Sequence, residues 1–324
     1  METVRRIDGF AGRYIPWFIL GAAVLGVAFP AVFAPLHSRL TLLLALLTFA
    51  NSLGGGFREL AAAFRDPRPI LAAFVVMHLV MPALVLGMGR VVFPNDADFV
   101  SGLVLQFTLP VGVATLMWVG MSGGRTGLCL SMVLLDTLLS PLTIPLTLQL
   151  LLGTAVEMDV WGMMRNLLLM VGIPALLGMT LHDAGGGRAA KPLKTLLALP
   201  GKLVILLIVA TTGSQCAEFF LGFDRWMLLV LCVVVALTVF GFWVGRLTAK
   251  ALGLEFPAAF TLTVMIGFRN ISAGIVLAQQ YFPVEALLPV AIVPLFQNLL
   301  MSIVIKVLWR TKDARAYLAG QANE

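Results

Sequence analysis

Long apolar runs separated by short polar segments are the dominant pattern of this chain. A helix that crosses a bilayer core of about 30 Å needs about 20 mostly apolar residues. Reading the runs against that length predicts ten spans. They lie at residues 14–34, 39–55, 69–90, 98–122, 126–152, 160–182, 197–215, 226–248, 256–282 and 284–308.

The composition supports the same class. The 324 residues are 60% apolar and 12% charged, with a mean hydropathy of +1.00. Soluble domains are about half apolar and about a quarter charged, so this chain has too little polar surface to cover a water-soluble globule. The loops are short, which predicts a single all-α polytopic membrane domain with no sizeable soluble part.

The Lys and Arg residues predict the orientation. Of the 22 Lys and Arg residues, three fall in loops on one side of the membrane, namely Arg39, Arg90 and Arg225, and two fall within spans, namely Arg165 and Arg269. The other 17 share the side of the N-terminus. Because cytoplasmic loops are rich in Lys and Arg, we expect both termini in the cytoplasm and the chain in the plasma (inner) membrane. This also explains the net charge of +6 without a nucleic-acid partner.

Other chemistry is sparse. Cys129, Cys216 and Cys232 lie in or near apolar runs without CxxC spacing, so we expect no disulfide framework, no metal site and no cofactor. A membrane-embedded enzyme is disfavoured because His78 has no HExxH or GxSxG context. The segment 57–68 is either a short amphipathic surface helix or a loop.

The ten spans divide into two halves of five, residues 1–155 and 156–324. Five is odd, so the second half must enter the membrane inverted relative to the first. Inverted repeats are typical of transporters, whose binding sites lie at discontinuous helices in matching positions of the two halves. The fourth span of each half should therefore be broken.

Both fourth spans carry helix breakers and polar groups at mid-depth. Pro110 removes a backbone hydrogen bond, and Gly112 allows unusual dihedral angles. In the other half, Gly267 precedes the pair Arg269 and Asn270. Irregular backbone is tolerated in a membrane only where it is buried or lines a cavity. These positions therefore predict two discontinuous helices that meet at a binding site.

Two charged residues lie well inside the spans. A central Arg such as Arg269 costs about 2.5–3.5 kcal/mol on insertion scales and usually serves function. Its planar guanidinium suits a carboxylate or a phosphate. Asp136 is either the permanent partner of Arg269 or a group that carries protons. His78 is a further candidate for coupling, and the alternative is that it satisfies a packing hydrogen bond.

Three stretches carry a resemblance to the bile acid:sodium symporter family. FRDPRPILAAFVVMHLVMP resembles the family's third span, PVGVATLMWVGMSGGRTGLCLSMVLLDTLLSPLTIP its fourth and fifth, and TVMIGFRNISAGIVLAQQYF its ninth. The resemblance implies a panel domain and a core domain, with spans 4 and 9 crossing at mid-membrane. Auxin-type and arsenite efflux carriers are similar in architecture.

The family's sodium ligands are mostly replaced. Thr115 keeps a hydroxyl and Asn270 keeps the family's amide, which contacts substrate in relatives. The remaining ligand positions hold Met77, Leu116, Cys129, Val133, Met265 and Arg269. The resemblance alone implies a sodium symporter, but these departures lead to the hypothesis that Arg269 stands where a sodium ion would stand, so that transport runs without sodium. Asp136, one turn beyond Val133, then becomes the candidate group for proton coupling.

Together these features predict a secondary carrier of a small, carboxylate-type organic anion that works by alternating access. The expected substrate contacts are Arg269, Asn270, Thr108, Gly112 and Thr115, followed by Ser272, Gln106 and Gln297. The alternatives are a sodium-coupled symporter with altered ion sites, an auxin- or arsenite-type efflux carrier, and a non-transporting sensor. The expected partners are the substrate, the lipid bilayer and protons.

Overall fold

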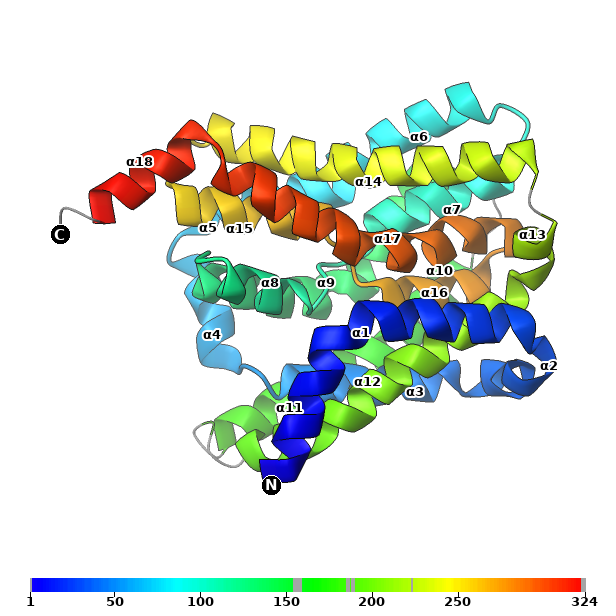
Figure 1. Cartoon of the computed structure of the whole chain (residues 1–324), viewed down its shortest axis with the longest axis horizontal. Coiled ribbons are helices and arrows are strands. Elements are labelled where there is room, and N and C mark those ends of the chain that lie inside the picture. The colour runs from blue at the N-terminus through cyan, green and yellow to red at the C-terminus, as the bar shows by residue number, and fades with distance from the viewer. Residues whose placement is uncertain (1, 154–158, 185–186, 188–189, 223, 322–324) are drawn as a thin grey trace.

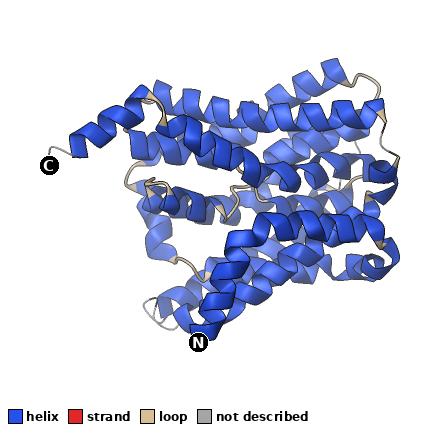
Figure 2. Ribbon diagram, viewed as in Figure 1, coloured by secondary structure: helices blue, strands red, loops and turns tan. Residues whose placement is uncertain are grey.

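A computed structural model gives the fold and describes residues 2–153, 159–184, 187, 190–222 and 224–321. These residues form helices and no strand (Figure 2). The α-helices are α1 (Glu2–Ala28), α2 (Pro30–Phe33), α3 (Leu40–Ser52), α4 (Phe57–Ala61), α5 (Pro67–Val75), α6 (Met81–Val92), α7 (Ala97–Thr108), α8 (Thr115–Met121), α9 (Thr126–Leu152), α10 (Val160–Leu167), α11 (Ile173–Ala184), α12 (Ala190–Gln215), α13 (Ala217–Leu221), α14 (Arg225–Ala251), α15 (Phe256–Gly267), α16 (Ile271–Tyr281), α17 (Val284–Trp309) and α18 (Lys312–Gln321). Two 3₁₀ helices, η1 (Ala34–Arg39) and η2 (Ala62–Phe64), and two π-helical turns, η3 (Val76–Val80) and η4 (Leu168–Gly172), join them.

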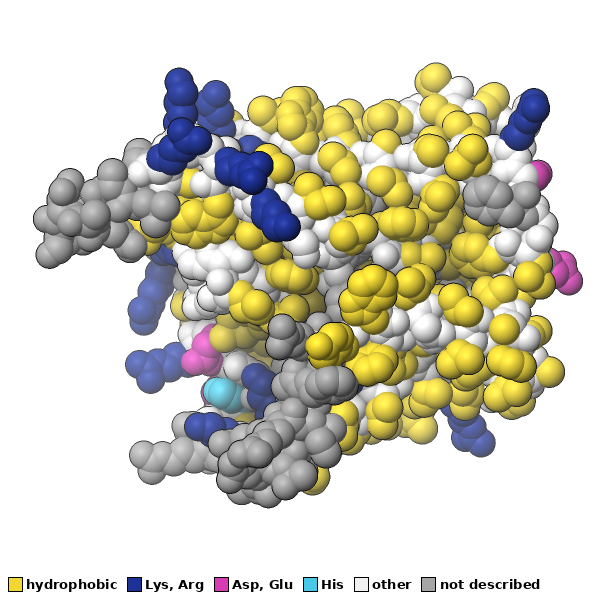
Figure 3. Space-filling view, viewed as in Figure 1, with side chains coloured by type: hydrophobic (Ala, Val, Ile, Leu, Met, Phe, Trp, Pro, Cys, Tyr) yellow, Lys and Arg dark blue, Asp and Glu magenta, His cyan; other side chains and the backbone are white. Residues whose placement is uncertain are grey.

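Many of these helices suit a bilayer. Within the described residues, seven helical stretches are long and apolar enough to cross one, and three shorter apolar helices accompany them. The seven are Pro30–Ser52, Pro67–Val92, Thr126–Leu152, Val160–Ala184, Ala190–Gln215, Arg225–Ala251 and Val284–Trp309. Figure 3 shows apolar side chains across the middle of one face, with Lys and Arg gathered toward the end that carries α18. The chain is an all-α polytopic membrane protein, and the number of ten spans stays a prediction.

The helix ends differ from the predicted ones where helices continue into polar sequence. α9 begins and ends where its predicted span does, whereas α12 begins at Ala190 instead of 197 and α1 at Glu2 instead of 14. Lys, Arg, Leu and Ala are good helix formers, so a helix does not stop where apolarity stops. The segment 57–68 is partly helical, as α4 and η2. The boundary between the predicted halves, 155/156, lies outside the described residues.

The helices pack in two layers (Figure 1). In the lower layer, α1 lies along α12, and α3 packs against α11 and α12. In the upper layer, α14 packs on α15 and α17, and α7 lies between α6 and α17. α8 and α9 lie between these layers in the same view and contact each other.

Two helices are interrupted, and their interruptions meet. α7 stops at Thr108 and α8 begins at Thr115, while α15 stops at Gly267 and α16 begins at Ile271. We call the two linking stretches, residues 109–114 and 268–270, the crossover. Val111 and Arg269 pair there as an antiparallel bridge. Irregular backbone is thus found at the two places that the breakers predicted.

Backbone hydrogen bonds hold the crossover together. The Gly112 amide donates to the Phe268 carbonyl at 3.2 Å, and the Asn270 amide donates to the Pro110 carbonyl at 2.8 Å. These bonds satisfy groups that lose their helical partners, which is essential where no water is available. A Cβ at Gly112 would lie 2.7 Å from the Arg269 carbonyl oxygen, so only glycine lets the two stretches approach this closely. Gly267 is the last residue of α15, directly before the second break.

We expect Gly112→Ala to destabilise the protein by about 1–3 kcal/mol, the usual cost of forcing extra atoms into a packed site. The apparent melting temperature in detergent measures this. Gly87→Ala is the matched control, because Gly87 lies on α6 with no atom within 4 Å of an added Cβ. Equal melting temperatures for the two variants would show that the two stretches of the crossover can move apart without loss of stability.

Candidate functional site

A cavity of about 770 Å³ lies between the lower layer and the crossover. Its walls come from α1, α3, α8, α9, α12, α16, α17 and both stretches of the crossover. Most of the lining is apolar. The polar lining residues are Asn51, Thr126, Lys194, Lys202, Arg269, Asn270, Ser272, Gln297 and Asn298. The described lining therefore includes three cationic side chains and no carboxylate.

Arg269 is 2% exposed and lines this cavity. Gln297 fixes its backbone, since the Arg269 amide donates to Gln297 Oε1 at 3.2 Å and Gln297 Nε2 donates to the Arg269 carbonyl at 3.3 Å. The guanidinium Nη1 donates to the Leu109 carbonyl at 3.3 Å. Nε and Nη2 have no hydrogen-bond partner among the described residues. A buried charged group left unsatisfied costs about 1–3 kcal/mol or more, so these donors favour an anion.

Asp136 contacts the crossover and is fully buried. Its Oδ2 accepts the Val111 amide at 2.7 Å, and its Oδ1 lies 2.7 Å from His78 Nε2. The structure gives Asp136 no ion pair with Arg269 within 4 Å, although the two charges attract each other through space. Of the two roles open for Asp136, direct pairing with Arg269 is therefore not the one seen.

His78 completes this group. It lies on the π-helical turn η3 and is 2% exposed, and its Nδ1 has no hydrogen-bond partner within the part of the chain that the structure describes. The Thr147 hydroxyl donates to the His78 carbonyl at 3.0 Å. π-helical turns occur often at functional sites because they displace a side chain from its helical position. The packing hydrogen bond considered for His78 is thus a bond to Asp136.

Apart from Gln106, which is buried and does not line the cavity, the remaining predicted contacts fall into two groups. Gly112, Asn270, Ser272 and Gln297 line the cavity, and the Asn270 side chain also caps α16 by accepting the Ala273 amide at 3.4 Å. Thr108 and Thr115 do not line the cavity. Both are fully buried, and their hydroxyls donate to the Val104 and Gly112 carbonyls at 2.8 and 2.6 Å. These two hydroxyls stabilise the helix ends beside the first break.

Lys194 and Lys202 line the cavity but were not among the predicted contacts. The sequence places both among the Lys and Arg residues of the N-terminal side, Lys194 ahead of the predicted span 197–215. Because α12 begins at Ala190, both residues lie on one continuous helix. Leu197, Ala198, Gly201 and Ile205 also line the cavity. These positions share one face of a helix, and that spacing was the signal in the sequence that could have identified Lys194 and Lys202.

The positions that the family resemblance gives to sodium ligands are apolar in the fold. Met77, Cys129, Val133 and Met265 belong to one buried hydrophobic cluster. The Cys129 thiol lies 3.4 Å from the Thr115 hydroxyl oxygen, the one side-chain oxygen kept in this group. Hard cations take oxygen ligands. The side chains of this cluster offer mainly hydrocarbon and sulfur.

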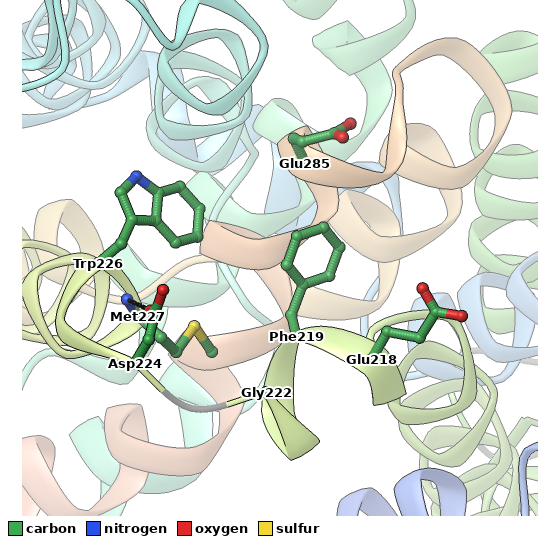
Figure 4. A pocket seen from close by; sticks show the side chains of 7 residues that line it. All are labelled: Glu218, Phe219, Gly222, Asp224, Trp226, Met227 and Glu285. Carbon is green, nitrogen blue, oxygen red and sulfur yellow. Dashed lines mark hydrogen bonds between the residues drawn. The ribbon is translucent and has the colours of Figure 1, made fainter.

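A second hollow, of about 320 Å³, lies beside α13. In Figure 1, α13 is at the end of the molecule away from α18. Figure 4 shows its lining side chains, which include the carboxylates of Glu218, Asp224 and Glu285. The Asp224 carboxylate accepts the Met227 amide at 2.8 Å and so caps α14. Its acidic lining makes this hollow unsuitable for an anion.

Glu59, His182 and Asp183 form a further cluster, with one possible ligand atom of each within 4.8 Å of the others. Each of these three side chains already makes a hydrogen bond to a backbone group. Glu59 accepts the Gly56 amide at 2.8 Å, Asp183 accepts the Phe57 amide at 2.9 Å, and His182 Nδ1 bonds to the Leu53 carbonyl at 3.0 Å. The Gly56 amide also holds the pKa of Glu59 below its usual range. The cluster fastens the loop between α3 and α4.

We expect Asp136→Leu to lower the apparent melting temperature more than Asp136→Asn. Leucine leaves the Val111 amide and His78 without a partner, at about 1–3 kcal/mol for each buried group, whereas asparagine keeps a carbonyl acceptor and adds a donor. Thermal unfolding in detergent at one pH compares them. Similar losses in both variants would show that the carboxylate does not hold the crossover.

Comparison with known proteins gives the family. The sodium bile acid symporter family matches residues 41–221. The uncharacterized protein YbaS of Bacillus subtilis is 35% identical over 87% of this chain and 92% of its own length. The uncharacterized sodium-dependent transporter YocS of the same organism is 26% identical over 92% of each chain. The probable chloroplastic sodium/metabolite cotransporter BASS1 of Arabidopsis thaliana is 24% identical over 91% of this chain and 72% of its own length. The chain belongs to the sodium bile acid symporter family, a family of secondary transporters.

Proposed function

We propose that this protein is a secondary carrier of a small organic anion of the carboxylate type. The observation that carries the proposal is Arg269, which lines a cavity whose described lining has no carboxylate. Two nitrogens of its buried guanidinium have no hydrogen-bond partner among the described residues. A guanidinium binds a carboxylate through two parallel hydrogen bonds. The anion would sit against the crossover, where Asn270, Ser272 and Gln297 offer polar contacts.

The proposed membrane arrangement is ten spans in two inverted halves, residues 1–155 and 156–324. The two broken helices, α7/α8 and α15/α16, are the fourth spans of these halves. Lys and Arg gather toward the end that carries α18, which supports placing both termini on the cytoplasmic side of the inner membrane. Transport by alternating access would expose the crossover to each side of the membrane in turn.

We propose further that transport does not require sodium. The support is chemical: Met77, Val133 and Met265 replace oxygen ligands, and Arg269 supplies a fixed positive charge beside the substrate. The second candidate function is sodium-coupled metabolite transport. The printed names of the relatives YocS and BASS1 favour that function.

Asp136 and His78 are the proposed site of proton coupling. Their side chains share a 2.7 Å contact, and the same carboxylate holds the Val111 amide of the crossover. Protonation of Asp136 would weaken its hold on that amide, because a neutral carboxyl is a poorer acceptor than a carboxylate. The crossover also holds Arg269 by its backbone bridge. A proton on one face of the crossover would thus affect an anion on the other.

We expect Arg269→Gln to abolish the stabilisation that organic anions give the wild type. A thermal-shift screen of carboxylates against purified protein identifies the binding anions, and the same screen on the variant tests the site. Arg269→Lys keeps the charge but loses the planar pair of donors, so we expect it to bind at least about tenfold more weakly.

Arg165→Gln is the matched control, because Arg165 is exposed on α10 and does not line the cavity. It should bind anions as the wild type does. Anion stabilisation that persists in Arg269→Gln would exclude Arg269 as the anion ligand.

Uptake into proteoliposomes tests the coupling ion. For the best anion of the screen, we expect equal uptake with sodium or potassium outside, and faster uptake when a proton gradient is applied. Asp136→Asn cannot titrate, so it should lose the response to the proton gradient and still bind the anion. A strict sodium requirement in the wild type would establish the second candidate function.

A further inference from the structure

The cavity reaches the surface at one end of the molecule. Its lining residues Thr126 and Lys194 are exposed, and they lie at the start of α9 and near the start of α12. On α12 the described lining stops at Val209, whereas the helix continues past it. On α16 the lining consists of the first two residues, Ile271 and Ser272. The cavity therefore opens where α12 begins, and the far ends of α12 and α16 lie beyond it.

The far end of α16 is bonded to the lower layer. α16 lies between the layers in Figure 1 and packs on α3 and α12 as well as on α7 and α17. Gln279 Nε2 donates to the Thr212 hydroxyl of α12 at 3.4 Å. The next residue, Gln280, donates through Nε2 to the Thr41 hydroxyl of α3 at 2.5 Å. Two adjacent side chains thus join α16 to two different helices.

The last residue of α16 reaches a third helix. The Tyr281 hydroxyl accepts from Asn166 Nδ2 at 2.5 Å and donates to the Gly162 carbonyl at 3.2 Å. Both partners belong to α10, which continues through η4 into α11, and α11 packs on α3. We call Gln279, Gln280 and Tyr281 the latch. Each member bonds a different helical segment of the lower layer.

The latch and the cavity lie at opposite ends of the same helices. Thr41 is at the start of α3, whereas Asn51, near the end of α3, lines the cavity. Ser272, Val276 and Gln280 share one face of α16, because they are four residues apart. Val276 is fully buried in the main hydrophobic cluster. Along this face a cavity residue, a buried apolar residue and a latch residue follow one another.

We propose that the latch holds the two layers together on the far side of the crossover, and that its bonds must break before the crossover can be reached from that side. The proposal rests on the alternating access proposed above and names the contacts that change during it. Three neighbouring residues break together when the end of α16 moves away from the lower layer. The open cavity and the closed latch are then two features of one state.

The first test measures access to Val276 in the full-length protein. Val276→Cys places a reporter thiol in the buried stretch, and Cys232→Ser removes the exposed native cysteine, while Cys129 and Cys216 are buried. A charged, membrane-impermeant thiol reagent is added to sealed vesicles of each orientation. With the latch intact, we expect slow labelling at position 276 from the face at which α16 ends.

Breaking the latch should speed this labelling. Gln280→Ala together with Tyr281→Phe removes the bonds of both residues and keeps the aromatic ring. We expect labelling at position 276 from that face to become about tenfold faster, because losing hydrogen bonds of this kind shifts a two-state equilibrium by about that factor.

Thr248→Val is the matched control. The Thr248 hydroxyl donates to the Val244 carbonyl of its own helix, α14, so its loss breaks no bond between the layers. Labelling at position 276 should match that of the parent. An equal rise in this control, or no rise in the latch variant, overturns the latch.

A second test locks the latch. Thr41→Cys and Gln280→Cys, in the Cys232→Ser background, are joined by a short bis-methanethiosulfonate reagent that a reducing agent removes. The joined protein should keep the thermal stabilisation by anions, because the cavity stays open at its other end, and should lose anion uptake until it is reduced. Uptake that continues through the joined protein overturns the latch.

The two tests separate this proposal from the anion carrier. Labelling at position 276 needs no substrate. If no anion binds the wild type but the latch variant still speeds labelling, the carrier function falls and the latch stands. If anions bind and the latch variant labels as slowly as the parent, the latch falls and the anion site stands.

Discussion

The need to satisfy backbone polar groups inside a bilayer governs this fold. Two helices stop in mid-molecule, and each break frees carbonyls and amides that lipid cannot bind. Residues 109–114 and 268–270 solve this by pairing with each other, through the Val111–Arg269 bridge and its flanking hydrogen bonds. Proline at 110 and glycine at 112 follow from that pairing. The first has no amide to satisfy, and the second has no Cβ to hold the stretches apart.

The paired backbone also separates two opposite charges. Asp136 holds the Val111 amide and is not among the described residues that line the cavity, whereas Arg269 is among them. Each charge has a different local partner, His78 for the carboxylate and the Leu109 carbonyl for one guanidinium nitrogen. A direct ion pair would have cancelled both charges. Their separation is the arrangement on which the proposed roles of Arg269 and Asp136 depend.

Much of this arrangement follows from the sequence, because breakers and buried charges are rare in apolar helices. Pro110, Gly112 and Arg269 mark the crossover without any structure, and Asp136 stands out as a charge within an apolar span. The Asp136–His78 contact could not be predicted, since it joins two spans distant in the chain and depends on the π-helical turn at His78.

The positively charged residues of the cavity wall, Lys194 and Lys202, were missed for a different reason. Apolarity marks where a helix enters lipid, but it does not mark where a helix begins. Lys194 therefore reads as a loop residue, although α12 extends past it. Thr108 and Thr115 show the converse case. A hydroxyl inside a membrane helix reads as a ligand, yet each here donates to a nearby carbonyl of its own segment.

The glycines between α3 and α4 have a mechanical consequence. α3 belongs to the lower layer, and the chain leaves it through Gly54, Gly55 and Gly56 before α4 begins at Phe57. Glycine backbone bends freely, and an extended chain spans at most about 3.3–3.6 Å per residue. This short linker thus acts as a tether of fixed length. It limits how far the end of α3 and the start of α4 can separate, and the bonds of His182 to Leu53 and of Asp183 to Phe57 hold both ends of the linker on α11.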